Sequence, residues 1–428
     1  MNKKVLLIED DEDVFEEYSI SYENMGYDVF PSSYEEYENI SNFNELVALV
    51  KEKTIFEKID FISIDLNLNG FELLEPTTTN PFKEQLGIEL LKKIVNSEVF
   101  PIRTIPILII SQFEQSDIDK AHKISQFTID YIYKDNLDKD EEFPLKGYFE
   151  RNKTKDNIKK KINLYRHFLN KEYEELFQEK LNLEHVNILI NSIKEQNNSS
   201  LVPYYQKICD EKEKTIKYEV LARIKKNEEV ENIFKYLNEA KFFGLLSFIT
   251  KKMVEKSLSK CHNNIHLSFN LDYLDLKKAN IDKLTNFLQE TIQKYGFQKE
   301  HITLEILEGV RHNQEIEDSI QQLHDHGYKI AIDDFGVENS NFKRLKSLIS
   351  KKCIDIVKID GEFIKDYNSN SISQTILKGI IEAITDDIVI VVEYVANEDL
   401  FNQLKNDHVR INQYQGYYFG EPKYKVEK

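Results

Sequence analysis

Polar side chains able to bind metal ions follow a series of short apolar segments in the second half of the chain. Each segment is rich in Ile, Val, Leu and Phe, which is typical of a buried β-strand. The polar residues are, in chain order, Glu219, Asn270, Glu305, Asp333, Asp334, Lys358, Asp360, Glu393 and Gln415. One Asp or Asn at such a place often only caps a helix. Recurrence over seven strand-like segments indicates a shared site instead.

The chemistry that these residue types favour is metal-dependent cleavage of a phosphoester. The set is rich in oxygen ligands and has no His or Cys cluster, which favours Mg²⁺ or Mn²⁺ over zinc. Two such ions would hold the attacking and leaving oxygens, and a lysine on the same rim would orient the nucleophilic water.

The elements that must position these residues alternate between strands and helices. Helical segments are predicted at Ile233–Ser257, Ile281–Tyr295 and Ile376–Ile384. The strand-like segments are Ile216–Tyr218, Ile265–Phe269, Ile302–Ile306, Ile330–Ile332, Ile354–Val357, Ile388–Val392 and Val409–Tyr414. This alternation predicts a TIM-like (β/α)8 barrel, in which functional residues gather at the carboxyl ends of the strands.

The first third of the chain predicts a second α/β unit, a doubly wound parallel sheet of the flavodoxin-like kind. Its strand-like segments are Val5–Ile8, Phe61–Ile64, Ile107–Ile110 and Tyr131–Tyr133, with charged helical segments such as Gly87–Val95 between them. The polar residues at the strand ends are Glu9, Asp10, Asp65, Ser111 and Lys134. They are expected to meet at one edge of the sheet, although each alone could simply end a strand.

These five residues suit the formation of an aspartyl phosphate. Glu9 and Asp10 can bind one Mg²⁺, and Asp65 is a carboxylate nucleophile. The set resembles the receiver domain of two-component response regulators, over residues 1–136. The resemblance implies phosphorylation of Asp65 by a cognate histidine kinase, with Ser111 and Lys134 contacting the phosphoryl group. Two departures are Asp135 in place of a proline and an inserted segment at 71–86.

Residues 137–199 are predicted to be the last receiver helix and a helical linker. From about Thr154 to Lys194 the chain lacks proline and glycine, and apolar residues recur at helical spacing. The polar segment Gln196–Ser200 marks the next boundary. Two interpretations stay open, a linker packed on its neighbours or an arm that transmits the receiver's state or mediates dimerisation.

Residues 200–428 resemble the EAL-type phosphodiesterases of the cyclic dinucleotide c-di-GMP. The sequence Glu219-Val220-Leu221-Ala222-Arg223 stands where the family's Glu-Ala-Leu is expected. Further matches are Tyr205-Gln206, Asn270, Glu305-Ile306-Leu307-Glu308, Asp333-Asp334-Phe335-Gly336, Lys358-Ile359-Asp360 and Gln415-Gly416-Tyr417.

The resemblance implies a role for each matching residue and hydrolysis of c-di-GMP to linear pGpG. Glu219, Asn270, Glu305 and Asp333 would bind one Mg²⁺ or Mn²⁺, and Asp333 with Asp334 would bind a second. Lys358 would hold the attacking water, with Glu393 as base or metal partner. Substrate contacts would come from Gln206, Arg223, Asp360 and Gln415, and Glu308 would position a loop. A homodimer is also expected.

Two stretches depart from the family pattern and keep other functions open. The segment Val337–Asn341 lacks the expected glycine, and Tyr394 replaces a glycine beside Glu393. A catalytically weak module that senses c-di-GMP or binds a protein is therefore an alternative. A third reading is a response-regulator scaffold that acts by protein association alone. No Gly-Gly-Asp-Glu-Phe stretch is present, so the sequence does not support synthesis of the dinucleotide.

Composition narrows the class of protein and its partners. A chain of 428 residues with 41% hydrophobic residues predicts two or three domains. The net charge of −18, from 57 basic and 75 acidic residues, argues against a DNA or RNA partner. Three scattered cysteines suit a reducing compartment, and no apolar stretch approaches the roughly 20 residues of a membrane span. We therefore expect a soluble cytoplasmic protein without a membrane partner.

Overall fold

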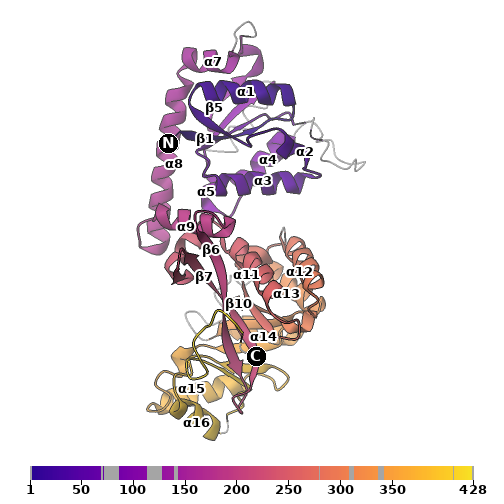
Figure 1. Cartoon of the computed structure of the whole chain (residues 1–428), viewed down its shortest axis with the longest axis vertical. Helices are drawn as coiled ribbons and strands as arrows, with labels where there is room; N and C mark the ends of the chain where they lie inside the picture. Colours follow the sequence, from indigo (N-terminus) through magenta and orange to yellow (C-terminus); the bar gives the residue numbers. More distant parts are fainter. Residues whose placement is uncertain are drawn as a thin grey trace. The chain divides into compact units, whose positions relative to one another are not determined.

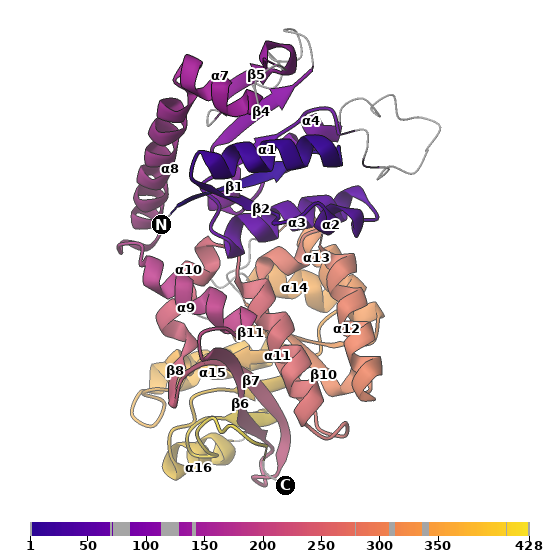
Figure 2. The same ribbon diagram turned by 45° about the horizontal axis from the view of Figure 1, so that its top comes forward.

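The computed structural model of the chain describes residues 2–68, 71, 86–112, 128–138, 143–278, 280–307, 313–335, 342–407 and 409–426. The chain divides into two compact units, Met1–Leu183 and Glu184–Lys428, whose elements are labelled in Figures 1 and 2. No helix within the described ranges has the length and apolar character needed to cross a membrane.

The first unit is built on a parallel five-stranded sheet with the order β2-β1-β3-β4-β5. The strands are β1 (Lys3–Ile8), β2 (Tyr27–Phe30), β3 (Phe61–Ile64), β4 (Ile107–Ser111) and β5 (Thr128–Tyr133). The four strands predicted from apolar segments are confirmed. Strand β2 was not predicted, because only Tyr27 of its four residues is buried and the strand has no apolar run.

Helices cover both faces of this sheet, as Figure 1 shows for α1 and α3. The helical elements are α1 (Glu12–Asn24), α2 (Glu35–Glu38), α3 (Phe43–Phe56), α4 (Leu86–Val95), α5 (Phe100–Arg103), η1 (Lys134–Asn136), α7 (Pro144–Asn152) and α8 (Thr154–Phe177). Asp11 caps α1, since its Oδ1 accepts a hydrogen bond of 3.1 Å from the backbone N–H of Val14.

The helical segment predicted between Thr154 and Lys194 consists of two helices. Helix α8 ends where Gln178 takes a φ of +55°, and α9 (Leu183–Lys194) begins five residues later. In α8 the residues Ile158, Ile162 and Tyr165 are buried within the first unit. This helix is therefore part of a folded core rather than a free spacer.

The second unit contains a closed barrel. Its strands follow the order β6-β14-β13-β12-β11-β10-β9-β7-β8, and an additional β6–β7 pairing closes the ring, with β8 outside it. The strands are β6 (Ser199–Cys209), β7 (Thr215–Lys226), β8 (Glu229–Asn232), β9 (Leu267–Leu271), β10 (Ile302–Leu307), β11 (Lys329–Phe335), β12 (Ile356–Ile359), β13 (Val389–Val392) and β14 (Gln413–Gln415). The predicted TIM-like barrel is confirmed.

One strand of the barrel runs against the others. β6 pairs antiparallel with both β7 and β14, whereas the other pairs around the ring are parallel. The reason is the short connection from Cys209 to Thr215, because a parallel pair needs a crossover of a dozen or more residues. A regular (β/α)8 repeat would not contain this hairpin.

Helices lie outside the barrel, as the labels α11 to α14 in Figure 2 show. The helical elements of this unit are α9, η2 (Ile233–Tyr236), α10 (Leu237–Phe242), α11 (Leu246–Lys260), η3 (Tyr273–Leu276), α12 (Ile281–Tyr295), η4 (Lys299–His301), α13 (Gln314–Asp325), α14 (Phe342–Lys351), η5 (Gly361–Phe363), α15 (Ser371–Glu382) and α16 (Glu398–Asn406). The prediction of α12 is confirmed to the residue. The single helix predicted at Ile233–Ser257 is wrong, because the chain breaks at Gly244, which has a φ of +65°.

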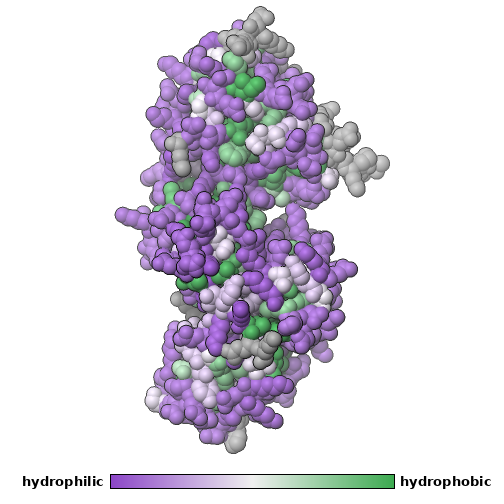
Figure 3. All heavy atoms as spheres, viewed as in Figure 1, coloured by the Kyte–Doolittle hydropathy of each residue, from purple (hydrophilic) through white to green (hydrophobic). Residues whose placement is uncertain are grey.

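The surface agrees with the acidic, polar composition. Figure 3 shows a mostly hydrophilic face with small hydrophobic patches. Apolar side chains from the strands form the core of the barrel. Ile208, Ala331, Ile356 and Val391 make up one cluster of this core.

Candidate functional site

The centre of the barrel site is the ammonium group of Lys358, which faces four carboxylates. Its Nζ lies 2.8 Å from Asp333 Oδ1, 2.9 Å from Glu305 Oε2, 3.0 Å from Glu393 Oε1 and 3.3 Å from Glu219 Oε2. These residues come from β7, β10, β11, β12 and the end of β13. Polar side chains from strands that are far apart in the sequence thus lie in contact with one another.

Burial makes this cluster electrostatically unusual. The Lys358 side chain is only 1% exposed, and its four carboxylate neighbours outweigh the effect of burial and raise its pKa well above the usual value. Burial raises the pKa of Glu305 to about 8, and it raises the pKa of Glu393 well above its usual value. Without metal ions, burial therefore favours the neutral form of Glu305 and Glu393, because one lysine cannot balance every acid of the cluster.

Two amide side chains hold Glu219 in place. Asn270 donates from Nδ2 to Glu219 Oε1 at 3.1 Å, and Gln415 donates from Nε2 to Glu219 Oε2 at 2.6 Å. Gln415 Nε2 also donates to Gln206 Oε1 at 3.3 Å. Burial opposes ionisation of Glu219, but Lys358 and these hydrogen bonds overcome it and lower the pKa of Glu219. Glu219 is thus a fixed anion on the wall of the site.

A bulge in β11 explains how two successive acids reach the same site. Side chains normally alternate between the two faces of a strand. The pairing of β11 with β12 shifts register between Ile332 and Phe335, and Asp334 takes a left-handed φ of +52°. As a result, carboxylate oxygens of Asp333, Asp334 and Glu393 come within 4.8 Å of one another. Burial raises the pKa of Asp334 to about 6.

The remaining predicted residues lie at different distances from this centre. Asp360 follows β12 directly and caps η5, where its Oδ1 accepts a hydrogen bond of 2.7 Å from the N–H of Glu362. Arg223 lies on β7 four residues after Glu219. Its guanidinium lies 5.7 Å from the centre of the Tyr204 ring. Glu308 and the segment Gly336–Asn341 fall outside the described residues.

The site also contains two buried residues that were not predicted from the sequence, Ser268 and Lys217. Ser268 donates a hydrogen bond from Oγ to Glu305 Oε1. Lys217 is 4% exposed, and no hydrogen-bond partner for its Nζ lies among the described residues. Burial lowers the pKa of Lys217 to about 8. Both precede a site residue by two positions, a spacing that places them on the same face of the strand.

The donor set fits divalent metal ions. One group, Glu219, Glu305 and Asp333, and a second, Asp333, Asp334 and Glu393, each bring their carboxylate oxygens within 4.8 Å of one another. Asp333 belongs to both groups. Oxygen-only ligands suit Mg²⁺ or Mn²⁺, and the shared acid suits a pair of neighbouring ions. Metal ions here would neutralise the acids and polarise a phosphoester bond.

The first unit has an acid cluster of its own at the carboxyl ends of its strands. Lys134 Nζ lies 2.8 Å from Asp65 Oδ2 and 3.0 Å from Glu9 Oε2. Oxygens of Glu9, Asp10 and Asp65 come within 4.8 Å of one another. Ser111 ends β4, and within the described ranges its buried Oγ has no hydrogen-bond partner. The structure therefore brings the predicted acids and Lys134 together.

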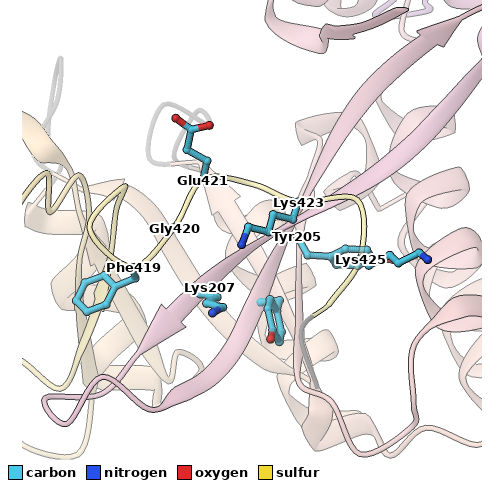
Figure 4. Close-up of a pocket in the computed structure, with 8 residues that line it drawn as sticks. Tyr205, Lys207, Phe419, Gly420, Glu421, Lys423 and Lys425 are labelled. Carbon is cyan, nitrogen blue, oxygen red and sulfur yellow. The ribbon is translucent and has the colours of Figure 1, made fainter. Parts of the chain in front are cut away.

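A small hollow lies on the opposite side of β6 from the barrel site. Figure 4 shows Tyr205, Lys207, Lys423 and Lys425 around it. Because side chains alternate along a strand, Gln206 points to Gln415 while its neighbours Tyr205 and Lys207 point the other way. This hollow is separate from the acid cluster.

Part of the chain is similar in sequence to known proteins. The chain is 32% identical over 265 residues to the cyclic di-GMP phosphodiesterase PdeA of Borreliella burgdorferi, covering 58% of this chain and 38% of that protein. It is 28% identical over 212 residues to the cyclic di-GMP phosphodiesterase PdeF of Escherichia coli, covering 48% and 28%. The matched regions thus span less than two fifths of either relative.

Solved structures and a family model agree on the fold. The EAL enzyme Bd1971 bound to cAMP and cyclic di-GMP superposes with a TM-score of 0.50 at 17% identity, covering 66% of this chain and 77% of that one. The model of the EAL domain matches residues 190–422, more than half of the 428 residues. The chain therefore belongs to the EAL domain family.

Proposed function

We propose that the second unit hydrolyses c-di-GMP to linear pGpG with two divalent metal ions. The observation that carries this proposal is the convergence of four buried carboxylates on Lys358 Nζ within 3.3 Å. The relatives named as cyclic di-GMP phosphodiesterases support the choice of substrate. In this proposal residues 200–428 are the phosphodiesterase domain.

The amides and acids on the wall would hold the two ions, Mg²⁺ or Mn²⁺. Glu219, Asn270, Glu305 and Asp333 would hold one, and Asp333 with Asp334 would hold the second. This division is supported by the two overlapping groups of carboxylates and by the hydrogen bond from Asn270 to Glu219. Ser268 would fix the orientation of Glu305 through the other carboxylate oxygen.

Lys358 and Glu393 would act on the attacking water. Lys358 carries a permanent positive charge because its neighbours raise its pKa, so it can orient an oxygen nucleophile by donating a hydrogen bond. Glu393 lies 3.0 Å from Lys358 Nζ and would take the proton of that water or serve as a metal partner. Arg223, Gln206, Gln415 and Asp360 would contact the dinucleotide, Arg223 at a phosphate.

Product analysis tests the proposed hydrolysis. Incubation of the purified protein with c-di-GMP and Mg²⁺ or Mn²⁺, followed by chromatography, should give pGpG. Glu219→Ala should lose this product, whereas Glu290→Ala, an exposed acid on α12, should retain it. The absence of pGpG with the unaltered protein and either metal would contradict the proposal.

We propose further that the first unit is a receiver domain, with residues 1–136 as its core and 137–199 as its last helix and linker. The strand order β2-β1-β3-β4-β5 is that of flavodoxin-like sheets, whose ligands bind at the switch point beside β1 and β3. Glu9, Asp10 and Asp65 would hold one Mg²⁺, and Asp65 would accept a phosphoryl group from a cognate histidine kinase. Lys134 and Ser111 would contact that group.

Phosphorylation of Asp65 would modulate hydrolysis, with the homodimer as the responding assembly. The test adds beryllofluoride and Mg²⁺ and measures pGpG formation and molecular mass together. A change in either that Asp65→Asn abolishes would support the proposal. An unchanged rate and mass would contradict it.

A sensor that binds c-di-GMP with little turnover is the second candidate, and one observation favours it. Tyr394 stands beside Glu393 in a left-handed conformation with a φ of +58°. This conformation costs a residue with a Cβ roughly 1–2 kcal/mol. Binding without pGpG formation would select this alternative.

A further inference from the structure

Tyr394 has a backbone conformation that the surrounding strands fix. The N–H of Glu393 donates to Ile359 O at 3.1 Å, and the N–H of Val395 donates to Gln415 O at 3.0 Å. The carbonyl of Val395 accepts a further hydrogen bond of 3.0 Å from the N–H of Tyr418. Since both neighbours are held, Tyr394 keeps its left-handed conformation and cannot relax by moving the loop.

The side chain of Tyr394 packs on a glycine that leaves room for it. A Cβ atom placed on Gly361 would lie 2.4 Å from Tyr394 Cβ and Cγ and 2.5 Å from its Cδ2. Only a residue without a side chain therefore permits this contact. Gly361 follows Asp360 directly, so the Tyr394 side chain covers the segment that leads out of β12.

The ring also lies beside the acid cluster while staying open to solvent. Tyr394 is 63% exposed. It follows Glu393 directly and its side chain packs on Gly361, the neighbour of Asp360, so the ring lies beside residues of the site. A large, solvent-facing aromatic side chain beside an acidic site does not contribute to the core.

We propose that Tyr394 is a stacking surface for one guanine base of the dinucleotide, and this inference rests on the proposed function. Aromatic side chains bind bases through their π-faces, and each such contact contributes substantially to affinity. A platform whose backbone is already fixed loses little freedom on binding. Tyr394 is thus a specificity residue that binds a base and leaves the reacting phosphodiester to the buried acids.

The test compares three substitutions at this position in the full chain. Tyr394→Ala should raise KM for c-di-GMP about tenfold with kcat changed less than about threefold. Tyr394→Gly should weaken binding equally while raising thermal stability, because glycine accepts a positive φ. Tyr394→Phe keeps the ring and should restore the affinity that alanine removes. Tyr295→Ala, which alters a half-buried tyrosine at the end of α12, is the control.

A fluorescent probe separates stacking from a structural role. A cyclic dinucleotide with one guanine replaced by 2-aminopurine should lose fluorescence on binding the unaltered protein and the Phe variant, and less on binding the Ala variant. Unchanged KM and quenching in the Ala and Gly variants would overturn the role of Tyr394 while hydrolysis by the unaltered protein stands. If the unaltered protein neither binds nor cleaves c-di-GMP, both this role and the proposed function are overturned.

Discussion

Each unit of this protein places a lysine among acids at the carboxyl ends of parallel strands, but the two arrangements differ in depth and charge. Lys134 contacts two carboxylates and its side chain is 14% exposed. Lys358 contacts four, and its side chain is 1% exposed. In an open sheet, side chains at the strand ends lie along an edge that water reaches. In a closed barrel, inward-facing side chains from all the strands surround one axis.

The difference shows how fold geometry sets the electrostatics of similar residues. At the open edge, Lys134 faces two carboxylates, and burial raises the pKa of Glu9 to about 8. In the barrel, four acids surround Lys358, and the amides of Asn270 and Gln415 donate hydrogen bonds to Glu219. Burial therefore opposes ionisation of Glu305 and Glu393 there unless further cations are bound, which is what a site for two metal ions would supply.

The largest effect is expected from removing the lysine of the barrel. Lys358→Met leaves four buried carboxylates without a counter-charge, so we expect the free energy of unfolding of this unit to fall by about 3–5 kcal/mol. Hydrolysis should fall at least about 100-fold. Hydrogen exchange of peptides from β11 and β12, with a turnover assay, measures both.

A matched lysine controls this experiment. Lys329 pairs with Asp355 at 2.6 Å, and its side chain is 48% exposed at the start of β11. Lys329→Met should cost less than about 1 kcal/mol, as exposed ion pairs do. Equal protection in both variants would show that the four carboxylates do not depend on Lys358.

A smaller effect is expected from Ser268→Ala. The change removes the hydrogen bond to the buried Glu305, so the free energy of unfolding should fall by about 1–3 kcal/mol. Because Glu305 loses its fixed orientation, Mn²⁺ affinity should fall about 10- to 100-fold. Calorimetric titration with Mn²⁺ measures this change. Ser259→Ala, an exposed serine on α11, should leave the titration unchanged.

Removal of Lys134 tests the more open acid cluster of the first unit. Lys134→Met leaves only Glu9 and Asp65 without a counter-charge at a partly exposed edge, so we expect a loss of about 1–2 kcal/mol, between exposed and buried ion pairs. Mg²⁺ should restore most of this stability. Thermal unfolding with and without Mg²⁺ measures it. A loss as large as that of Lys358→Met would remove the distinction between the two sites.

The smallest effect is expected for the pH dependence of Mg²⁺ binding at the acid cluster around Glu9. The pKa of Glu9 is raised to about 8, chiefly by burial and then by Asp65. A carboxyl whose folded pKa is raised favours folding most below its unfolded pKa of about 4.5, and this contribution is lost as pH rises through 8. A metal ion must displace that proton, so Mg²⁺ affinity should increase between pH 6 and pH 8. Calorimetry in buffers of different ionisation enthalpy should detect proton release at pH 7, and none in Glu9→Gln.

Much of the fold could be predicted because the local spacing of apolar residues indicates most of its helices and strands. The helix α12 was predicted to the residue, since its apolar spacing is regular and Gly296 ends it with a φ of +72°. Predictions failed where the pattern was short or interrupted, as at β2 and at Gly244. The strand predicted at Val409–Tyr414 starts only at Gln413, and β12 extends to Ile359, so Lys358 lies within the strand.

The sequence by itself determined which polar residues lie on or directly after the strands and in what order, because short apolar runs mark buried strands wherever they pack. Only the tertiary structure decided how those residues meet. The hairpin partner β6 closes the barrel in the reverse direction, and the bulge in β11 turns Asp333 and Asp334 to one side. The spacing of two residues puts Ser268 on the face of Asn270, but only the register of β9 with β7 and β10 brings it to Glu219 and Glu305. Such contacts join residues distant in the chain, and no local pattern encodes them.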